Sequence, residues 1–144
     1  MKKMLLAGAL MLLTFLGARA QEYRVTLEPG VPAQAAQLLQ QRMEQMLQGG
    51  GLTLASEEHI QKDCSQIKAV TVKAVVTSRM ETPGSITQIA ITADVVASCG
   101  EVSETFTIKG VGADDDDAWL RAVKQFLPRS KAAQGFTERL KAAL

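Results

Sequence analysis

The fold is decided between residues 67 and 108, where the sequence reads IKAVTVKAVVTSRMETPGSITQIAITADVVASCGEVSETFTI. Apolar and polar residues alternate through three segments of this stretch, a period of two that is typical of strands with one buried face. Short turn signals separate the segments, so they are expected to form an antiparallel meander. The buried faces are predicted to carry Val70, Val72, Ala74 and Val76, then Ile89, Ile91, Ala93, Val95 and Ala97.

Both turns can be placed from their residue types. Thr82-Pro83-Gly84-Ser85 has proline second and glycine third, as several tight turns prefer. Gly100-Glu101 fits a two-residue type II′ hairpin loop, which takes glycine first. With these tips the apolar faces of all three strands coincide, as a consistent register requires. The predicted partners are Val76 with Ile91, Ala74 with Ala93 and Val72 with Val95 across the first turn, and Val95 with Phe106 and Ala93 with Ile108 across the second.

Helical patterns flank the meander on both sides. Upstream, Tyr23, Val25 and Leu27 predict a strand, and a helix with an apolar stripe follows from Pro32 to Gly49-Gly50-Gly51. Downstream, a second amphipathic helix is expected to end at Pro128. The apolar positions of that helix are Trp119, Leu120, Ala122, Val123, Phe126 and Leu127, and those of a third are Phe136, Leu140, Ala143 and Leu144. A sheet with helices on one face and polar Thr and Lys on the other predicts a two-layer α+β sandwich.

The first 20 residues have the pattern of a secretory signal peptide, with Lys2-Lys3, a short apolar run and small residues before Gln21. Cleavage is expected between Ala20 and Gln21, leaving residues 21–144 as one domain without a membrane span. The leader takes three basic residues with it, so 13 Lys and Arg face 15 Asp and Glu in the mature chain. These charges are scattered, whereas nucleic-acid binders cluster theirs on a basic face. Nucleic acid is therefore not expected as a partner.

Two cysteines, Cys64 and Cys99, lie in the exported part of the chain. An even number of cysteines in an oxidising compartment favours a disulfide over two free thiols. A structural Cys64–Cys99 bridge is the prediction, and two reduced, buried thiols are the alternative.

The most conspicuous polar feature is a run of four acids that follows Gly110-Val111-Gly112, namely Asp114, Asp115, Asp116 and Asp117. Four carboxylates would repel a phosphate, and the lysine of a phosphate-binding loop is missing. A calcium ion suits these four side chains better, although the spacing of an EF-hand is absent and consecutive residues point in different directions around a helical turn. The simplest interpretation is that one Asp caps a helix and its neighbours interact with the positive end of the helix dipole.

A catalytic interpretation would use His59, Glu57 and the Asp run. One histidine without a cysteine cluster makes a zinc site weak, and no nucleophile-elbow motif is present. Trp119 occupies a helical core position, and so do Met43 and Met46, so these three residues are expected to pack rather than to bind. No cofactor is expected.

Lys109-Gly110-Val111-Gly112, leading through acids into Ala118-Trp119-Leu120-Arg121-Ala122-Val123, carries a resemblance. With the order of strand, helix and meander, it resembles the amino-terminal domain of exported bacterial proteins of unknown function. More distantly, it is similar to small α+β modules of penicillin-binding-protein activators, of the curli secretion channel and of the Tol-system propeller protein. Lipidated members carry an anchoring Cys that this chain lacks. The resemblance implies a binding or assembly module and offers no catalytic residues.

The functional expectation is a secreted or periplasmic, non-enzymatic module that binds a protein of the cell envelope through a sheet edge or a helix face. A self-assembling homo-oligomer is a variant of this interpretation. The rival is a small hydrolase or metal-dependent enzyme that uses Asp114–Asp117, His59 or Glu57. That rival requires at least two of these groups to converge in one concave pocket.

Overall fold

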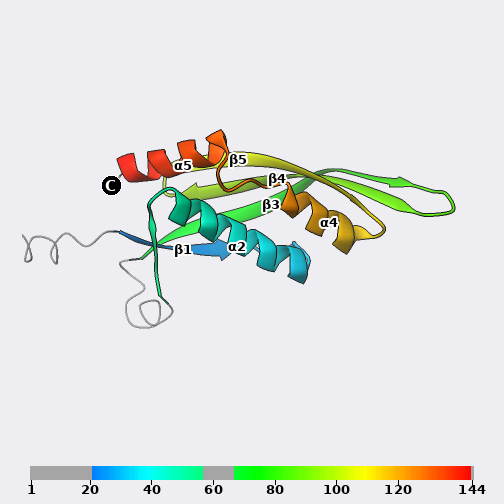
Figure 1. The fold of residues 1–144 in the computed structure, drawn as a ribbon, viewed down its shortest axis with the longest axis horizontal. Coiled ribbons are helices and arrows are strands. Elements are labelled where there is room, and N and C mark those ends of the chain that lie inside the picture. Colours follow the sequence, from blue (N-terminus) through cyan, green and yellow to red (C-terminus); the bar gives the residue numbers. More distant parts are fainter. Residues whose placement is uncertain (1–20, 57–66, 144) are drawn as a thin grey trace, which may run out of the picture.

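The structure, a computed structural model, describes residues 21–56 and 67–143. Within these ranges, five strands form one sheet in the order β2-β1-β3-β4-β5, and three helices pack on one of its faces (Figure 1). The α+β sandwich predicted from the sequence is confirmed. The strands are β1 (Glu22–Leu27), β2 (Thr53–Leu54), β3 (Ile67–Thr82), β4 (Gln88–Cys99) and β5 (Val102–Gly112), and the helices are α2 (Ala33–Gly49), α4 (Asp115–Lys124) and α5 (Lys131–Ala142).

The sheet combines a parallel and an antiparallel half. β1 pairs in parallel with β2 on one side and with β3 on the other, while β3, β4 and β5 form the predicted meander. Helix α2 connects β1 to β2, which is the covered crossover that parallel strands need. The sequence pattern identified β1 as a strand but did not place it beside β3.

The second hairpin has the predicted register. Val95 pairs with Phe106 and Ala93 with Ile108 across the Gly100-Glu101 loop. Gly100 has φ +61°, and no described residue other than glycine has a positive φ, so only the first loop position is left-handed. A type II′ loop requires that combination.

The first hairpin departs from its predicted register. Val76 pairs with Ala93 instead of Ile91, and a β-bulge follows between Val76 and Ser78. The connection runs over five residues, 83–87, where the sequence suggested a two-residue tip. The observed register differs from the predicted one by two positions, so the same residues still face the core side of the sheet. Val76, however, is exposed and not buried as predicted.

The core lies between the helices and the sheet. The largest fully buried side chains of the helices are Leu39, Met43, Met46 and Leu47 of α2, Val123 of α4 and Phe136 of α5, and those of the sheet are Tyr23, Val70, Val72, Ile91, Val95 and Ile108. Trp119 is buried as predicted. Phe126 packs edge-on against Phe106, with ring centroids 5.0 Å apart. Leu127, predicted on the apolar stripe of the second helix, instead lies beyond the end of α4 and is 61% exposed.

Helix α2 ends in a complete Schellman motif. Gly51 has φ +85°, its amide donates to the Gln48 carbonyl, and the Leu52 amide donates to the Leu47 carbonyl at 2.9 Å. Leu52 and Leu47 are both buried, which supplies the hydrophobic contact of the motif. The glycine triplet therefore ends the helix as the sequence predicted, with Gly51 as the left-handed residue.

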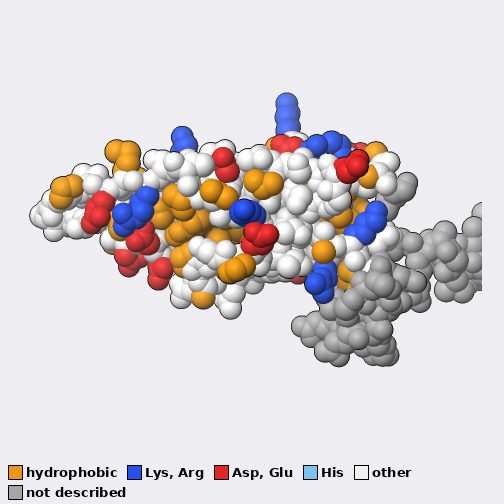
Figure 2. Space-filling view, turned by 180° about the vertical axis from the view of Figure 1, so that it is seen from behind, with side chains coloured by type: hydrophobic (Ala, Val, Ile, Leu, Met, Phe, Trp, Pro, Cys, Tyr) orange, Lys and Arg blue, Asp and Glu red, His pale blue; other side chains and the backbone are white. Residues whose placement is uncertain are grey.

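Beyond the body of the molecule, the β3–β4 hairpin projects as a long arm (Figure 1). β1 pairs with β3 only as far as Val72, so the outer part of β3 has no neighbour on that side among the described strands. Val75, Met80 and Ile86 are exposed on this arm. Seen from behind, hydrophobic side chains gather on the half of the molecule that bears the arm (Figure 2).

Candidate functional site

Helix α4 lies directly against the backbone of β5 because two glycines make room for it. A Cβ atom on Gly110 would stand 2.2 Å from the Ala118 carbonyl oxygen, and one on Gly112 would stand 2.5 Å from the Ala118 amide nitrogen. No side chain fits at such distances. The Gly-x-Gly sequence therefore allows the close helix–strand contact, and this contact places α4 beside β5.

The acidic run after these glycines begins α4. The Asp114 side chain accepts a hydrogen bond from the Asp117 amide at 2.7 Å, so Asp114 is the N-cap, as the simplest interpretation predicted. Asp117 accepts from the Ala113 amide at 3.1 Å and pairs with Arg121 at 3.2 Å. The Ala113 amide, and after it the Arg121 guanidinium, lower the pKa of the Asp117 carboxyl. These contacts are local to the start of the helix.

Asp115 turns away from its neighbours toward the arm. The Arg79 guanidinium on β3 donates to both of its carboxylate oxygens, at 2.8 and 3.1 Å, and this bidentate contact lowers the pKa of Asp115. The pair ties the base of the arm to the start of α4.

The four aspartates considered as calcium ligands have separate surroundings. Asp116 lies in the first turn of α4 with an exposed side chain, where its charge faces the positive end of the helix dipole. Asp114 caps the helix, Asp115 contacts the arm and Asp117 contacts Arg121. Over the residues that the structure describes, no group of three His, Cys, Asp or Glu is placed to hold a metal ion. The structure therefore does not gather Asp114, Asp115, Asp116 and Asp117 into the calcium site that the sequence left open.

Strand β5 forms one edge of the sheet, and no other described strand pairs with its outer side. Cys99 and Val102 flank the two-residue loop as a hydrogen-bonded pair, so every second residue from Val102 directs its amide and carbonyl toward β4. The intervening residues direct theirs toward the open side. These are Ser103, Thr105, Thr107, Lys109 and Val111, all exposed.

The open edge of β5 is long and regular. Its eleven pairs with β4 run without a bulge, and the strand contains no proline. Bulges and prolines are two of the features that commonly protect exposed edges from pairing with another strand, and β5 has neither. By contrast, the open part of β3 carries the bulge at Thr77. β5 is thus the better template for an added strand.

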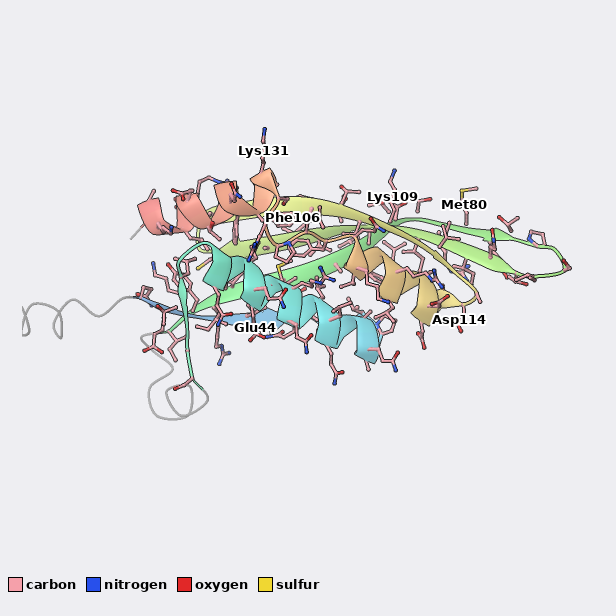
Figure 3. The ribbon with its side chains drawn as sticks, viewed as in Figure 1. Glu44, Met80, Phe106, Lys109, Asp114 and Lys131 are labelled. Atoms are coloured by element: carbon pink, nitrogen blue, oxygen red, sulfur yellow. The ribbon has the colours of Figure 1, made fainter. Side chains whose placement is uncertain are left out.

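A groove of about 630 Å³ lies along this edge. Three cations line it, Lys109 from β5 and Arg121 and Lys124 from α4, together with one acid, Asp117. Lys109 projects from the same side of the sheet as Met80, away from α2 and α4 (Figure 3). The other lining residues are Ala90, Thr92, Gly110, Val111 and Gln125. The residues that line the groove therefore combine the outward backbone groups of β5 with a net positive charge, which is carried by Lys109 on one side of the sheet and by Arg121 and Lys124 of α4 on the other.

The remaining sequence candidates are Cys99 and residues that the structure does not describe. His59, Glu57, Cys64 and the leader through Ala20 lie outside the described residues, so their predicted roles stay predictions. Cys99 is half-buried at the end of β4, and burial raises the pKa of its thiol.

The cations of the groove were not singled out from the sequence. Asp117, Arg121 and Lys124 follow helical spacing and could have been assigned to one face of α4. This face lies beside an open strand because α4 packs closely on Gly110 and Gly112. That contact is tertiary packing, which the spacing of residues in the sequence does not reveal.

Comparison with family models and with curated proteins found no match to the chain. Among solved structures, a minor lipoprotein from Acinetobacter baumannii is similar with a TM-score of 0.43 and 13% identity, over 86% of this chain and 94% of that one. The resemblance to activator, curli and Tol-system modules stays a prediction. None of the described helices is long and apolar enough to cross a membrane.

Proposed function

We propose that the protein is an exported binding module without catalytic chemistry, which accepts an extended segment of another cell-envelope protein along the open edge of β5. The observation that carries this proposal is the bulge-free edge itself, with outward amides and carbonyls from Ser103 to Val111. Main-chain hydrogen bonds to such an edge supply affinity in strand addition. Export rests on the leader-like sequence of residues 1–20.

The partner segment carries acidic side chains. Of the described residues, Lys109, Arg121 and Lys124 line the groove together with one carboxylate, that of Asp117. A groove with one dominant sign of charge attracts the opposite sign and raises the rate of encounter. The backbone thus determines that a strand binds, and the cations favour an acidic one.

The test removes an edge amide without touching the fold's own hydrogen bonds. Thr105→Pro deletes an N–H that pairs with no described strand, and proline is tolerated at sheet edges. Thr105→Ala is the matched control, because it keeps the amide. Ser103→Pro is a second edge variant, for use if Thr105→Pro fails to fold.

In the producing cell, a photo-crosslinking residue is placed at Thr107 on the β5 edge or, for comparison, at the exposed Gln37 on α2. We expect one acidic envelope protein to crosslink from position 107, to be retained in Thr105→Ala and to be lost in Thr105→Pro. Equal capture in a folded Thr105→Pro or Ser103→Pro variant, or capture from position 37 alone, would exclude strand addition at β5.

A further inference from the structure

A second groove lies between α2 and the segment that joins α4 to α5. Its volume is about 820 Å³, within the range of small-ligand pockets. It shares no lining residue with the groove beside β5. The residues that line it are Arg42, Gln45, Gln48 and Gly49 of α2, and Leu127, Pro128, Arg129 and Ser130 of the joining segment.

Of the residues that the structure describes, two arginines from different elements line this groove, and no acid does. Arg42 is half-buried, and its Nη1 donates to the Phe126 carbonyl at 3.4 Å, which anchors the side chain. Among the described residues, neither Arg42 nor Arg129 forms an ion pair with a carboxylate. Two like charges therefore line one hollow without a counter-charge from the described residues, which favours a positive potential there.

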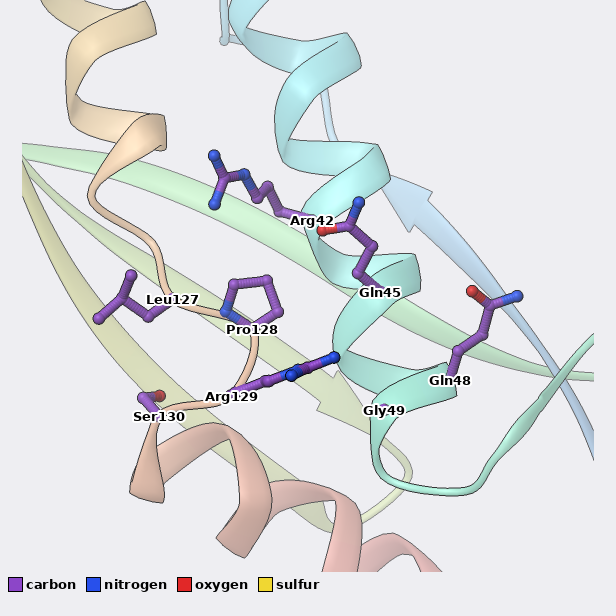
Figure 4. Close-up of a pocket in the computed structure, with 8 residues that line it drawn as sticks. All are labelled: Arg42, Gln45, Gln48, Gly49, Leu127, Pro128, Arg129 and Ser130. Atoms are coloured by element: carbon purple, nitrogen blue, oxygen red, sulfur yellow. The ribbon is translucent and has the colours of Figure 1, made fainter.

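The geometry of the groove suits a small amphipathic anion. Arg129 extends across the groove toward α2, below Gln45, whose amide is a further hydrogen-bond donor, while Gln48 projects from the far side of the helix (Figure 4). On the other wall stand Pro128 and Leu127, the latter 61% exposed. A guanidinium matches the two oxygens of a carboxylate or phosphate with parallel hydrogen bonds.

We propose that this groove binds the oxyanion group, carboxylate or phosphate, of a small ligand whose apolar part lies on Leu127 and Pro128. Arg129 contacts the oxyanion, Arg42 adds a second positive charge, and the Gln45 amide is a further donor. The site is independent of strand addition at β5.

The test is calorimetric titration of the full exported chain with inorganic phosphate, acetate and butanoate. We expect phosphate or the carboxylates to bind, the affinity to fall with added salt, and Arg129→Gln to weaken binding by about tenfold or more. Lys131→Gln is the matched control. Lys131 lies two residues after Arg129 and carries the same charge, but its side chain does not line the groove. This variant should leave binding within about twofold.

The three anions distinguish the ligand classes. Binding of phosphate alone identifies a phosphate site, and tighter binding of butanoate than of acetate identifies a carboxylate site with an apolar contact at Leu127. Arg42→Lys keeps the positive charge at this position. If this variant still binds the anion, a loss of binding in Arg129→Gln is due to the lost charge and not to a disturbed fold. The proposal is overturned if none of the three anions binds, or if Lys131→Gln weakens binding as much as Arg129→Gln.

Discussion

At the scale of single residues, Gly110 and Gly112 have the largest consequence for the candidate site. The sequence shows two glycines before an acidic run, and the acids argue against a phosphate-binding loop without showing what the glycines are for. The structure places the Ala118 and Ala122 backbone where any Cβ on Gly110 would lie. The glycines are therefore required by packing, and they bring the cations of α4 beside β5.

Replacing Gly110 by alanine should destabilise the fold strongly. The new Cβ would meet backbone atoms at 2.2 and 2.3 Å, which cannot move without displacing α4, so we expect a loss of about 3 kcal/mol, the upper end of overpacking effects. Gly135→Ala is the control, because nothing lies within 4 Å of its Cβ and it should stabilise α5 by about 1 kcal/mol. Urea unfolding of both variants measures the difference. Equal effects would mean that α4 does not lie against β5.

The aspartates at the start of α4 should make the stability of the fold sensitive to acid. Folding lowers the pKa of Asp117, through the Ala113 amide and Arg121, and the pKa of Asp115, through Arg79. A lowered pKa stabilises the folded state above the ordinary carboxyl value of about 3.9 and loses that stabilisation as the pH falls through the folded pKa. The effect is small because Asp115 is exposed and Asp117 is only partly buried.

The double variant Asp115→Asn, Asp117→Asn should therefore melt at a lower temperature than the natural chain near neutral pH. The difference should shrink as the pH falls below about 4. Thermal melts between neutral and acidic pH measure both midpoints. A difference that stays constant, or grows, on acidification would show that these contacts do not lower the two pKa values.

At the scale of elements, prediction from sequence succeeds where a turn is fixed by its own residues. Gly100-Glu101 allows one loop length, so the partners of β4 and β5 follow from it. Thr82-Pro83-Gly84-Ser85 can be placed within a longer loop, and the bulge at Thr77 adds a residue to β3. Alternation alone does not reveal either change, because a shift of two residues keeps the same face.

The helical stripe has a similar limit at its end. Leu127 continues the apolar pattern of the second predicted helix, but α4 ends at Lys124 and the chain turns before Pro128. The residue before a proline is biased away from helix, yet this bias does not indicate how many residues earlier the helix ends. Leu127 is consequently left on the surface, at the rim of the groove proposed for oxyanions.

Leu127 and Phe136 were both predicted as apolar helix positions, but only Phe136 is buried, so truncating each should affect stability differently. Phe136 of α5 is fully buried, so Phe136→Ala should cost about 3–5 kcal/mol of unfolding free energy. Leu127→Ala should change it by less than about 0.5 kcal/mol, because the side chain is already in solvent. Chemical denaturation provides the comparison. A large loss for Leu127→Ala would contradict the position of this segment.

At the scale of the whole molecule, sequence reasoning identified the layers but not the edges. The fold class follows from alternating strands and amphipathic helices, and it is confirmed. The parallel insertion of β1 beside β3 was not predicted, because parallel partners are joined by distant contacts rather than by a local turn. The sequence therefore indicated that an open edge would matter, without indicating that β5 provides it.

The predicted Cys64–Cys99 disulfide can be tested directly. If the two cysteines are joined, the exported protein should show no reactive thiol until it is reduced, and reduction should lower its stability by about 3–4 kcal/mol. Thiol titration in denaturant, with and without reductant, measures the number of reactive thiols. Urea unfolding of the oxidised and reduced protein measures the change in stability. Two titratable thiols in the unreduced protein would contradict the disulfide.

Amide hydrogen exchange of β5 tests strand addition most directly. In the free protein, the amides of Thr105, Thr107 and Lys109 face the open edge, whereas those of Phe106 and Ile108 are paired with β4. We predict rapid exchange for the first set and slow exchange for the second, with the first set becoming slow once the acidic partner is bound. Edge amides that exchange as rapidly with the partner as without it would contradict the account.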